Sequence, residues 1–247
     1  SSIKRFDRYF GNMIKRLNLD EINLVIYSDH GMSFGKFIEF SQGEEIKRIA
    51  GDNLNVYIHP HIYLKDPDVK DQVAQSIVQE SEIDFTFYKE NFNRVVGYSV
   101  FGKMIFEGKE EGKIRYLYEG EDVLTYYLDG YQGEWLTPLE WLSLTRDSNF
   151  PAVPPNIYNL LLNEKAGDII IVVNPPKIPI FPSIFYPANH AGVVHTDLLV
   201  PILLRGKELE HLYDREEMWL HNLFTRIPAL SFENLEKKKK KNNLSFW

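Results

Sequence analysis

The feature that most constrains the fold is a pair of largely apolar runs, Ile22–Tyr27, in which only Asn23 is polar, and Asp168–Val173, which is apolar after its first residue. Neither run alternates with polar residues, as a strand with one solvated face would. The first run follows a segment from Ile3 to Leu17 in which apolar residues recur at the spacing of an amphipathic helix. Helix, short loop and fully apolar strand in succession are typical of a parallel sheet that helices cover on both faces. The sequence therefore predicts an α/β fold with a largely parallel sheet and helices on both faces.

The remaining patterns predict shorter strands and helices. Apolar or loosely alternating runs predict strands, and apolar residues three or four positions apart predict helices. We expect strands at Leu54–Ile62, Ile83–Tyr88 and Leu198–Leu204, and helices at Pro67–Glu80, Asn156–Leu162 and Met218–Ile227.

The region 94–150 has a different pattern. Short β-type runs are separated there by glycine and charged residues, as in antiparallel hairpins, so we expect a small antiparallel β insertion. The predicted domains are residues 1–93 and 151–232 as two parts of the α/β domain, 94–150 as an inserted α+β subdomain, and 233–247 as a basic tail. We expect the lysine run Lys237–Lys241 to be solvated; a localisation or anion-binding role is the alternative.

Charge and cysteine content exclude several classes of function. The chain has 28 Lys and Arg against 35 Asp and Glu, and a net charge of -7 argues against general nucleic-acid binding. A phosphate-bearing substrate remains compatible, because a bound dication can reverse the sign of the local field. The absence of cysteine excludes disulfides, thiolate metal sites and cysteine nucleophiles, so nitrogen and oxygen atoms must hold any metal.

The sequence also lacks the signals of membrane insertion. No apolar stretch approaches the roughly 20 residues that a membrane span needs, and no charged-then-apolar leader is present. We therefore expect a cytoplasmic protein without a membrane span. Because the chain begins at Ser1 rather than at methionine and enters a helix pattern directly, we also expect that a preceding part of the protein exists.

The first candidate site is Ser28-Asp29-His30-Gly31-Met32, directly after the first apolar run. Open α/β sheets bind ligands at the carboxyl ends of their strands. At a strand end that turns through Gly31, the Asp29 carboxylate and the His30 imidazole can converge on one ion, and oxygen with nitrogen ligands suits Zn²⁺ or Mn²⁺. The alternative is a loop in which Asp29 caps the next turn and His30 bonds to the backbone.

The second candidate site is Asn189-His190-Ala191-Gly192, shortly before the apolar run Leu198–Leu204. His190 is a candidate metal ligand at this strand edge, and a structural or solvent-facing histidine is the alternative. His195 follows closely and is itself followed by Asp197. It could be a further ligand, a base that contacts substrate, or a cap for the next element.

Other histidines carry less weight. His59 and His61 flank Pro60, so alternation along a strand would put both on one side, as in a metal pair. We favour a structural role for both, because no nearby carboxylate completes a ligand set. His211 and His221 lie in helical surroundings and receive no functional assignment.

Other catalytic schemes find no support in the sequence. There is no Gly-x-Ser-x-Gly nucleophile elbow and no glycine-rich phosphate loop ending in Lys-Ser or Lys-Thr. A set of aromatic residues could line a substrate pocket, although such residues more often form core. Its members are Tyr126, Tyr127, Tyr131, Trp135 and Trp141.

Taken together, these segments resemble the alkaline phosphatase superfamily, and most closely its type I phosphodiesterase/nucleotide pyrophosphatase branch. The resemblance covers both ends of the chain and is weak between about Arg94 and Phe150. The matching segments are the helix with Asp7 and Gly11, Ser28–Met32 after its strand, Ala166–Val172, Asn189–Gly192 and Val200–Leu203.

The resemblance implies a phosphoric ester hydrolase with two divalent metal ions, Zn²⁺ or Mn²⁺, and a phosphodiester or nucleotide as substrate. Such enzymes transfer a phosphoryl group through a Thr or Ser nucleophile. It implies that Asp29 and His30 bind the ion that activates the nucleophile, and that His190 binds the ion that polarises the phosphoryl oxygen. Ala191 stands where the family commonly has glycine, a mild change that does not forbid ligation.

In the family, the nucleophile and the other metal ligands precede the helix that opens this chain. The chain then corresponds to the C-terminal half of the catalytic domain, and we expect the nucleophile upstream of Ser1. By itself the chain is expected to bind metal weakly and to be inactive, with the N-terminal half as its partner. The alternatives are another activity of the superfamily (phosphonate hydrolase, sulfatase or phosphoglycerate mutase) and a diverged, non-catalytic domain that binds a partner.

Overall fold

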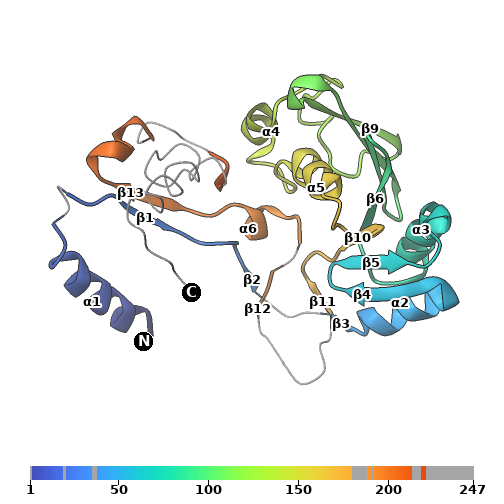
Figure 1. Ribbon diagram of the computed structural model, residues 1–247, viewed down its shortest axis with the longest axis horizontal. Coiled ribbons are helices and arrows are strands. Elements are labelled where there is room, and N and C mark those ends of the chain that lie inside the picture. Colours follow the sequence, from blue (N-terminus) through green and yellow to red (C-terminus); the bar gives the residue numbers. More distant parts are fainter. Residues whose placement is uncertain are drawn as a thin grey trace, which may run out of the picture. The chain divides into compact units, whose positions relative to one another are not determined.

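The computed structural model describes residues 2–18, 21–34, 38–179, 188–190, 192–212 and 218–220 (Figure 1). The chain divides into two units. The first consists of Ser1–Asp29 and Val200–Trp247, and the second of His30–Leu199.

The second unit is built on a long meander of strands with helices between them. Its α-helices are α2 (Gln42–Ala50), α3 (Lys70–Glu80), α4 (Pro138–Thr145), α5 (Val153–Leu162) and α6 (His195–Leu198), and its short 3-10 helices are η1 (Gly51–Asn53), η2 (Pro67–Val69) and η3 (Glu110–Gly112). Its strands are β2 (Ser33–Phe34), β3 (Ile38–Phe40), β4 (Leu54–Ile58), β5 (His61–Leu64), β6 (Phe85–Asn91), β7 (Arg94–Tyr98), β8 (Gly102–Gly108), β9 (Ile114–Gly120), β10 (Ile169–Val172), β11 (Lys177–Pro179) and β12 (Ala188–Asn189).

The main sheet has seven strands in the order β4-β5-β10-β6-β7-β8-β9. Every neighbouring pair in it is antiparallel. The predicted largely parallel α/β sheet is therefore wrong. A short parallel pairing does occur outside this sheet, between β11 and β3.

The error has a physical cause that is visible in β10. All four of its residues are buried. Ile169 and Ile171 pack in one core with residues of α2 and α3, whereas the buried Ile170 is not part of that core. Helix α5 contacts strands β6 to β9 and lies on the other side of the sheet from α3 (Figure 1). A strand that is buried on both faces, as β10 is, is apolar throughout whether its neighbours are parallel or antiparallel.

Several local predictions are confirmed. The predicted helix Pro67–Glu80 corresponds to η2 followed by α3, and the Asp66 side chain caps it by accepting the Asp68 N–H at 3.0 Å. The predicted strand Leu54–Ile62 is instead a hairpin of β4 and β5.

The region 94–150 contains the predicted antiparallel strands. These strands, β7, β8 and β9, continue outward from β6, so they extend the main sheet rather than form a small separate one. A chain of contacting aromatic rings runs from β6 through β8 and β9 to α4. The Phe87 and Phe106 ring centroids lie 5.6 Å apart, and those of Tyr131 and Trp141 lie 4.7 Å apart. Of the aromatic set considered as a pocket lining, Tyr126, Tyr131 and Trp141 are buried core residues, whereas Trp135 lines a cavity.

The first unit contains α1 (Ser2–Ile14), β1 (Leu24–Tyr27), β13 (Ile202–Arg205) and η4 (Lys207–Leu212). The predicted helix and the first predicted strand are present, and β1 pairs antiparallel with β13. The strand predicted at Leu198–Leu204 begins later than expected, because Leu198 ends α6. Most of the helix predicted at Met218–Ile227 and the whole of Lys237–Lys241 lie outside the described residues.

The aromatic core predicts a strong dependence of stability on Phe87. Its side chain is 0% exposed, and replacing a buried phenylalanine by alanine costs about 3–5 kcal/mol through lost burial and the cavity left behind. We expect Phe87→Ala to lower the urea midpoint of the second unit, followed by circular dichroism. Phe101→Ala is the matched control, because Phe101 is 64% exposed and should change stability by less than about 0.5 kcal/mol. Equal midpoints for the two variants would contradict the described packing.

Candidate metal-binding site

The two predicted site segments meet through a short strand pairing. β2 and β12 are antiparallel, with Ser33 opposite Asn189 and Phe34 opposite Ala188. His30 precedes β2 and His190 follows β12. In an antiparallel pair the start of one strand lies beside the end of the other, so the two histidines lie at the same end of this ladder.

The imidazole rings of His30 and His190 are in contact. Their centroids are 3.6 Å apart, and the ring planes are inclined by 20°, so the rings are stacked. His30 is half-buried and His190 is exposed. The His30 Nδ1 lies 2.7 Å from the Gly31 carbonyl oxygen, and since a carbonyl can only accept, Nδ1 is the donor. This hydrogen bond fixes the tautomer in which Nε2 carries the lone pair that a metal ion requires.

Gly31 allows the loop after β1 to approach the backbone of α6 closely. Its N–H donates to the Asp197 carbonyl oxygen at 2.8 Å. A Cβ atom at this position would lie 1.9 Å from the Thr196 carbonyl oxygen, far inside van der Waals contact. The glycine is therefore required by a close backbone approach and holds His30 in place.

The Asp197 carboxylate ties the two site segments together. It is 3% exposed. Its Oδ1 accepts the Ser33 hydroxyl at 2.6 Å, and its Oδ2 accepts the Gly192 N–H at 3.0 Å. One buried side chain thus fixes both β2, which His30 precedes, and the segment that follows His190. In the sequence Asp197 stands out only as a neighbour of His195, because no local pattern indicates its hydrogen bond to Ser33, 164 positions away.

Asn174 anchors the same segment to the main sheet. It lies just beyond the end of β10, and its Oδ1 accepts the Val193 N–H at 2.9 Å. Its own N–H donates to Asp84 Oδ2 at 2.7 Å, and the Lys177 ammonium lies 2.9 Å from Asp84 Oδ1. The segment after His190 is thereby attached to a residue that closely follows the buried strand β10.

The other histidines have structural surroundings. His61 Nδ1 accepts the Gly167 N–H at 3.1 Å, which agrees with the structural role favoured for it. His59 Nδ1 lies within hydrogen-bond distance of Gln42 Oε1 and the Tyr57 hydroxyl. Burial, and then the charges of His61 and His190, lower the pKa of His59 below its ordinary value. His195 is exposed at the start of α6.

Asp29 is the last residue of the first unit, and His30 is the first residue of the second. The Asp29 side chain is exposed. Within the described ranges, no group of three or more His, Cys, Asp or Glu side chains is arranged to hold a metal ion. The structure therefore brings together two of the three predicted ligands, His30 and His190, as a pair. Ala191 lies outside the described residues.

Comparisons with protein-family models, with curated proteins and with solved structures find no match to this chain. Among the helices that the structure describes, none is both long enough and apolar enough to span a membrane.

The close approach at Gly31 predicts that this position tolerates no side chain. We expect Gly31→Ala to destabilise the second unit by about 1–3 kcal/mol, because the new methyl group displaces the Thr196 carbonyl and breaks the hydrogen bond to Asp197. Amide exchange at Gly192 should accelerate as well, since its partner is the Asp197 carboxylate.

Gly43→Ala is the matched control. Gly43 lies in α2, and its Cβ would meet the Tyr57 ring at 3.8 Å, an ordinary contact. Alanine in a helix should leave stability unchanged or raise it by up to about 1 kcal/mol. If urea unfolding gave the same midpoint for both alanine variants, the Gly31 approach as described would be incorrect.

Proposed function

We propose that this chain is part of a metal-dependent hydrolase of phosphoric esters, of the phosphodiesterase/nucleotide pyrophosphatase type. In this proposal Asp29 and His30 bind one divalent ion and His190 binds a second, with Zn²⁺ or Mn²⁺ as the metal. The observation that carries it is the contact between the His30 and His190 rings, which are distant in the sequence and joined through the β2–β12 pairing.

The donor set fits such ions in two respects. The hydrogen bond from His30 Nδ1 to the Gly31 carbonyl is the arrangement usual for histidines that bind metal through Nε2. The 3.6 Å contact between the ring centroids places two imidazoles side by side, as ligands of neighbouring ions in a two-metal site need to be.

The protein contribution in this proposal is placement. Asp197 and Asn174 hold the segment that follows His190, and Gly31 and Ser33 hold the segment around His30, so the backbone near both histidines is held before an ion arrives. When bound, divalent ions would supply positive charge to a phosphate ester and polarise its phosphorus–oxygen bonds. The proposal assigns the nucleophile and the remaining ligands to no residue of this chain.

Metal binding by the chain itself is the first test. We expect weak Zn²⁺ binding by isothermal titration calorimetry, and a loss of at least about tenfold in affinity for His30→Ala and for His190→Ala, because each removes one of few ligands. His211→Ala is the control, since His211 is an exposed residue of η4 and is not one of the proposed ligands. Unchanged Zn²⁺ affinity in both site variants would refute the assignment of the ligands.

Hydrolysis is the second test, on the chain together with the N-terminal half that the proposal requires. We expect cleavage of bis-p-nitrophenyl phosphate or p-nitrophenyl phosphate with Zn²⁺ or Mn²⁺, and none after EDTA treatment. His30→Ala and His190→Ala should each reduce the rate by at least about 100-fold, since even residues that only support metal ligands contribute 10- to 100-fold. Full metal-dependent activity in both variants would rule out the proposed function, while His211→Ala should retain it.

A further inference from the structure

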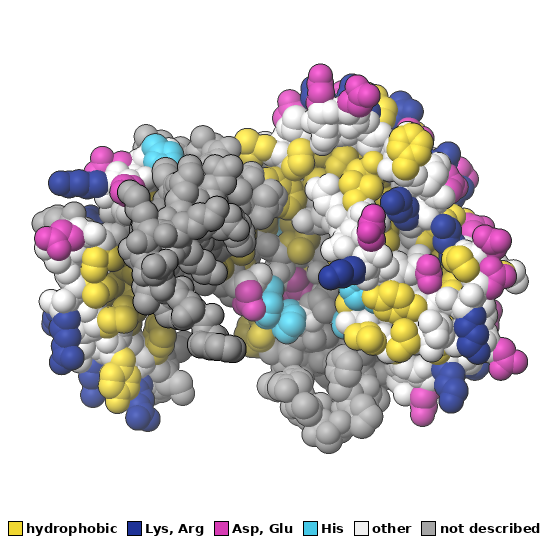
Figure 2. Space-filling view, viewed as in Figure 1, with side chains coloured by type: hydrophobic (Ala, Val, Ile, Leu, Met, Phe, Trp, Pro, Cys, Tyr) yellow, Lys and Arg dark blue, Asp and Glu magenta, His cyan; other side chains and the backbone are white. Residues whose placement is uncertain are grey.

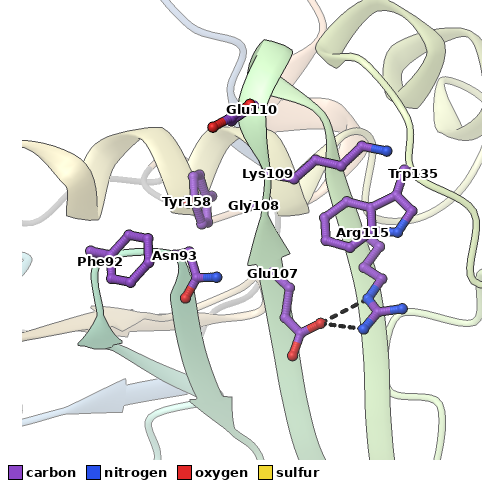
Figure 3. A pocket seen from close by; sticks show the side chains of 9 residues that line it. All are labelled: Phe92, Asn93, Glu107, Gly108, Lys109, Glu110, Arg115, Trp135 and Tyr158. Carbon is purple, nitrogen blue, oxygen red and sulfur yellow. Dashed lines mark hydrogen bonds and ion pairs between the residues drawn. The ribbon is translucent and has the colours of Figure 1, made fainter.

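A second polar site lies at one end of the main sheet, within the second unit. A cavity of about 620 Å³ opens there between the β6–β7 turn, the end of β8, the start of β9 and α5 (Figure 3). This volume falls within the range of about 300–1,000 Å³ usual for small-molecule sites. None of the residues that line it belongs to the candidate metal site.

One end of the cavity carries two cationic side chains, Lys109 and Arg115, and the carboxylates of Glu107 and Glu110 also line the cavity (Figure 3). The Lys109 Nζ lies 5.0 Å from the centre of the Trp135 ring, and the Arg115 Cζ lies 4.7 Å from the same centre. Arg115 is also paired with Glu107, with its Nε and Nη2 at 2.7 and 2.6 Å from one carboxylate oxygen. The Lys109 ammonium and the Arg115 nitrogen that does not bond to Glu107 have no carboxylate partner among the described residues.

The other end is aromatic. Figure 3 shows Phe92, Asn93 and Tyr158 on the side of Gly108 opposite to Trp135. Phe92 is 81% exposed in the β6–β7 turn, although it is a large apolar side chain. Tyr158 lies directly over Gly108, where a Cβ atom would be 2.0 Å from the Tyr158 hydroxyl oxygen. The missing side chain at Gly108 thus lets the tyrosine ring form part of the cavity wall.

Two polar groups at the aromatic end have no hydrogen bond within the described part of the chain. These are the Tyr158 hydroxyl, whose side chain is mostly buried, and the Asn93 side-chain amide. Burial raises the pKa of Tyr158, so the hydroxyl stays protonated and can donate. Both groups are available to polar substituents of a ligand.

We propose that this cavity binds a small molecule in which an anionic group is attached to a planar ring. Lys109 and Arg115 take the anion, and Phe92 and Tyr158 contact the ring, with Asn93 bonding to its substituents. On the face drawn in Figure 2, acidic and basic side chains are interspersed over the second unit, and the chain as a whole carries a net charge of -7. A preference for anions must therefore come from cations placed together, as they are here.

Calorimetry with three simple probes tests the proposal, on the 247-residue chain with EDTA present so that no metal site contributes. Phenylphosphonate carries ring and anion, methylphosphonate only the anion, and benzyl alcohol only the ring. We expect phenylphosphonate to bind at least about tenfold more tightly than either of the others, because both ends of the cavity are then used. Phe92→Ala and Lys109→Met should each weaken its binding by about tenfold.

Two matched controls accompany these variants. Phe101→Ala removes another exposed phenylalanine from a hairpin turn, and Lys89→Met removes another lysine, and neither residue lines the cavity. Both should bind phenylphosphonate as the unmodified chain does. The proposal fails if phenylphosphonate does not bind, if it binds no better than methylphosphonate, or if Phe92→Ala and Lys109→Met bind it as tightly as the controls.

Discussion

The structure of the second unit depends on the burial of β10 between β5 and β6. This strand arrives late in the chain and pairs antiparallel with both neighbours, so it joins the β4–β5 hairpin to the meander β6–β9 in one sheet. All four of its residues are buried, two of them in the core with α2 and α3. Asp168 fixes its start by accepting the Leu64 N–H at 2.7 Å. Without this strand, two sets of pairings that are each local in sequence would have no common core.

The same strand supports the candidate metal site. Asn174, just after β10, holds Val193, and the Asp197 carboxylate then links Gly192 to Ser33. The placement of exposed His190 thus follows from hydrogen bonds that lead back to the most buried strand. Because these bonds are made by buried groups, breaking one leaves a polar atom unsatisfied, which is costly. Hydrogen bonds that lead back to the sheet thus hold the loop segments next to His30 and His190.

What the sequence could predict was local. Helical spacing identified α1 and α3, and the apolar run identified β10 as a central strand, because each pattern is complete within a few residues. The predicted parallel direction of the strands was wrong, because an apolar run indicates burial on both faces and not the direction of the neighbouring strands. The two site segments could be recognised from short motifs, and the structure brings their histidines into contact. The role of Asp197 could not be predicted from the sequence, because its hydrogen-bond partner Ser33 comes from a distant part of the chain.

The two proposed sites differ in how an acidic chain could attract an anionic ligand. At His30 and His190 the positive charge would come from the ions that the proposal has them bind. In the cavity beside Trp135 the charge is covalently part of the chain, in Lys109 and Arg115. EDTA removes the first source and leaves the second, whereas Lys109→Met weakens the second and leaves the first. The two sites therefore respond to different perturbations, and the binding of an anion at one can be measured without the other.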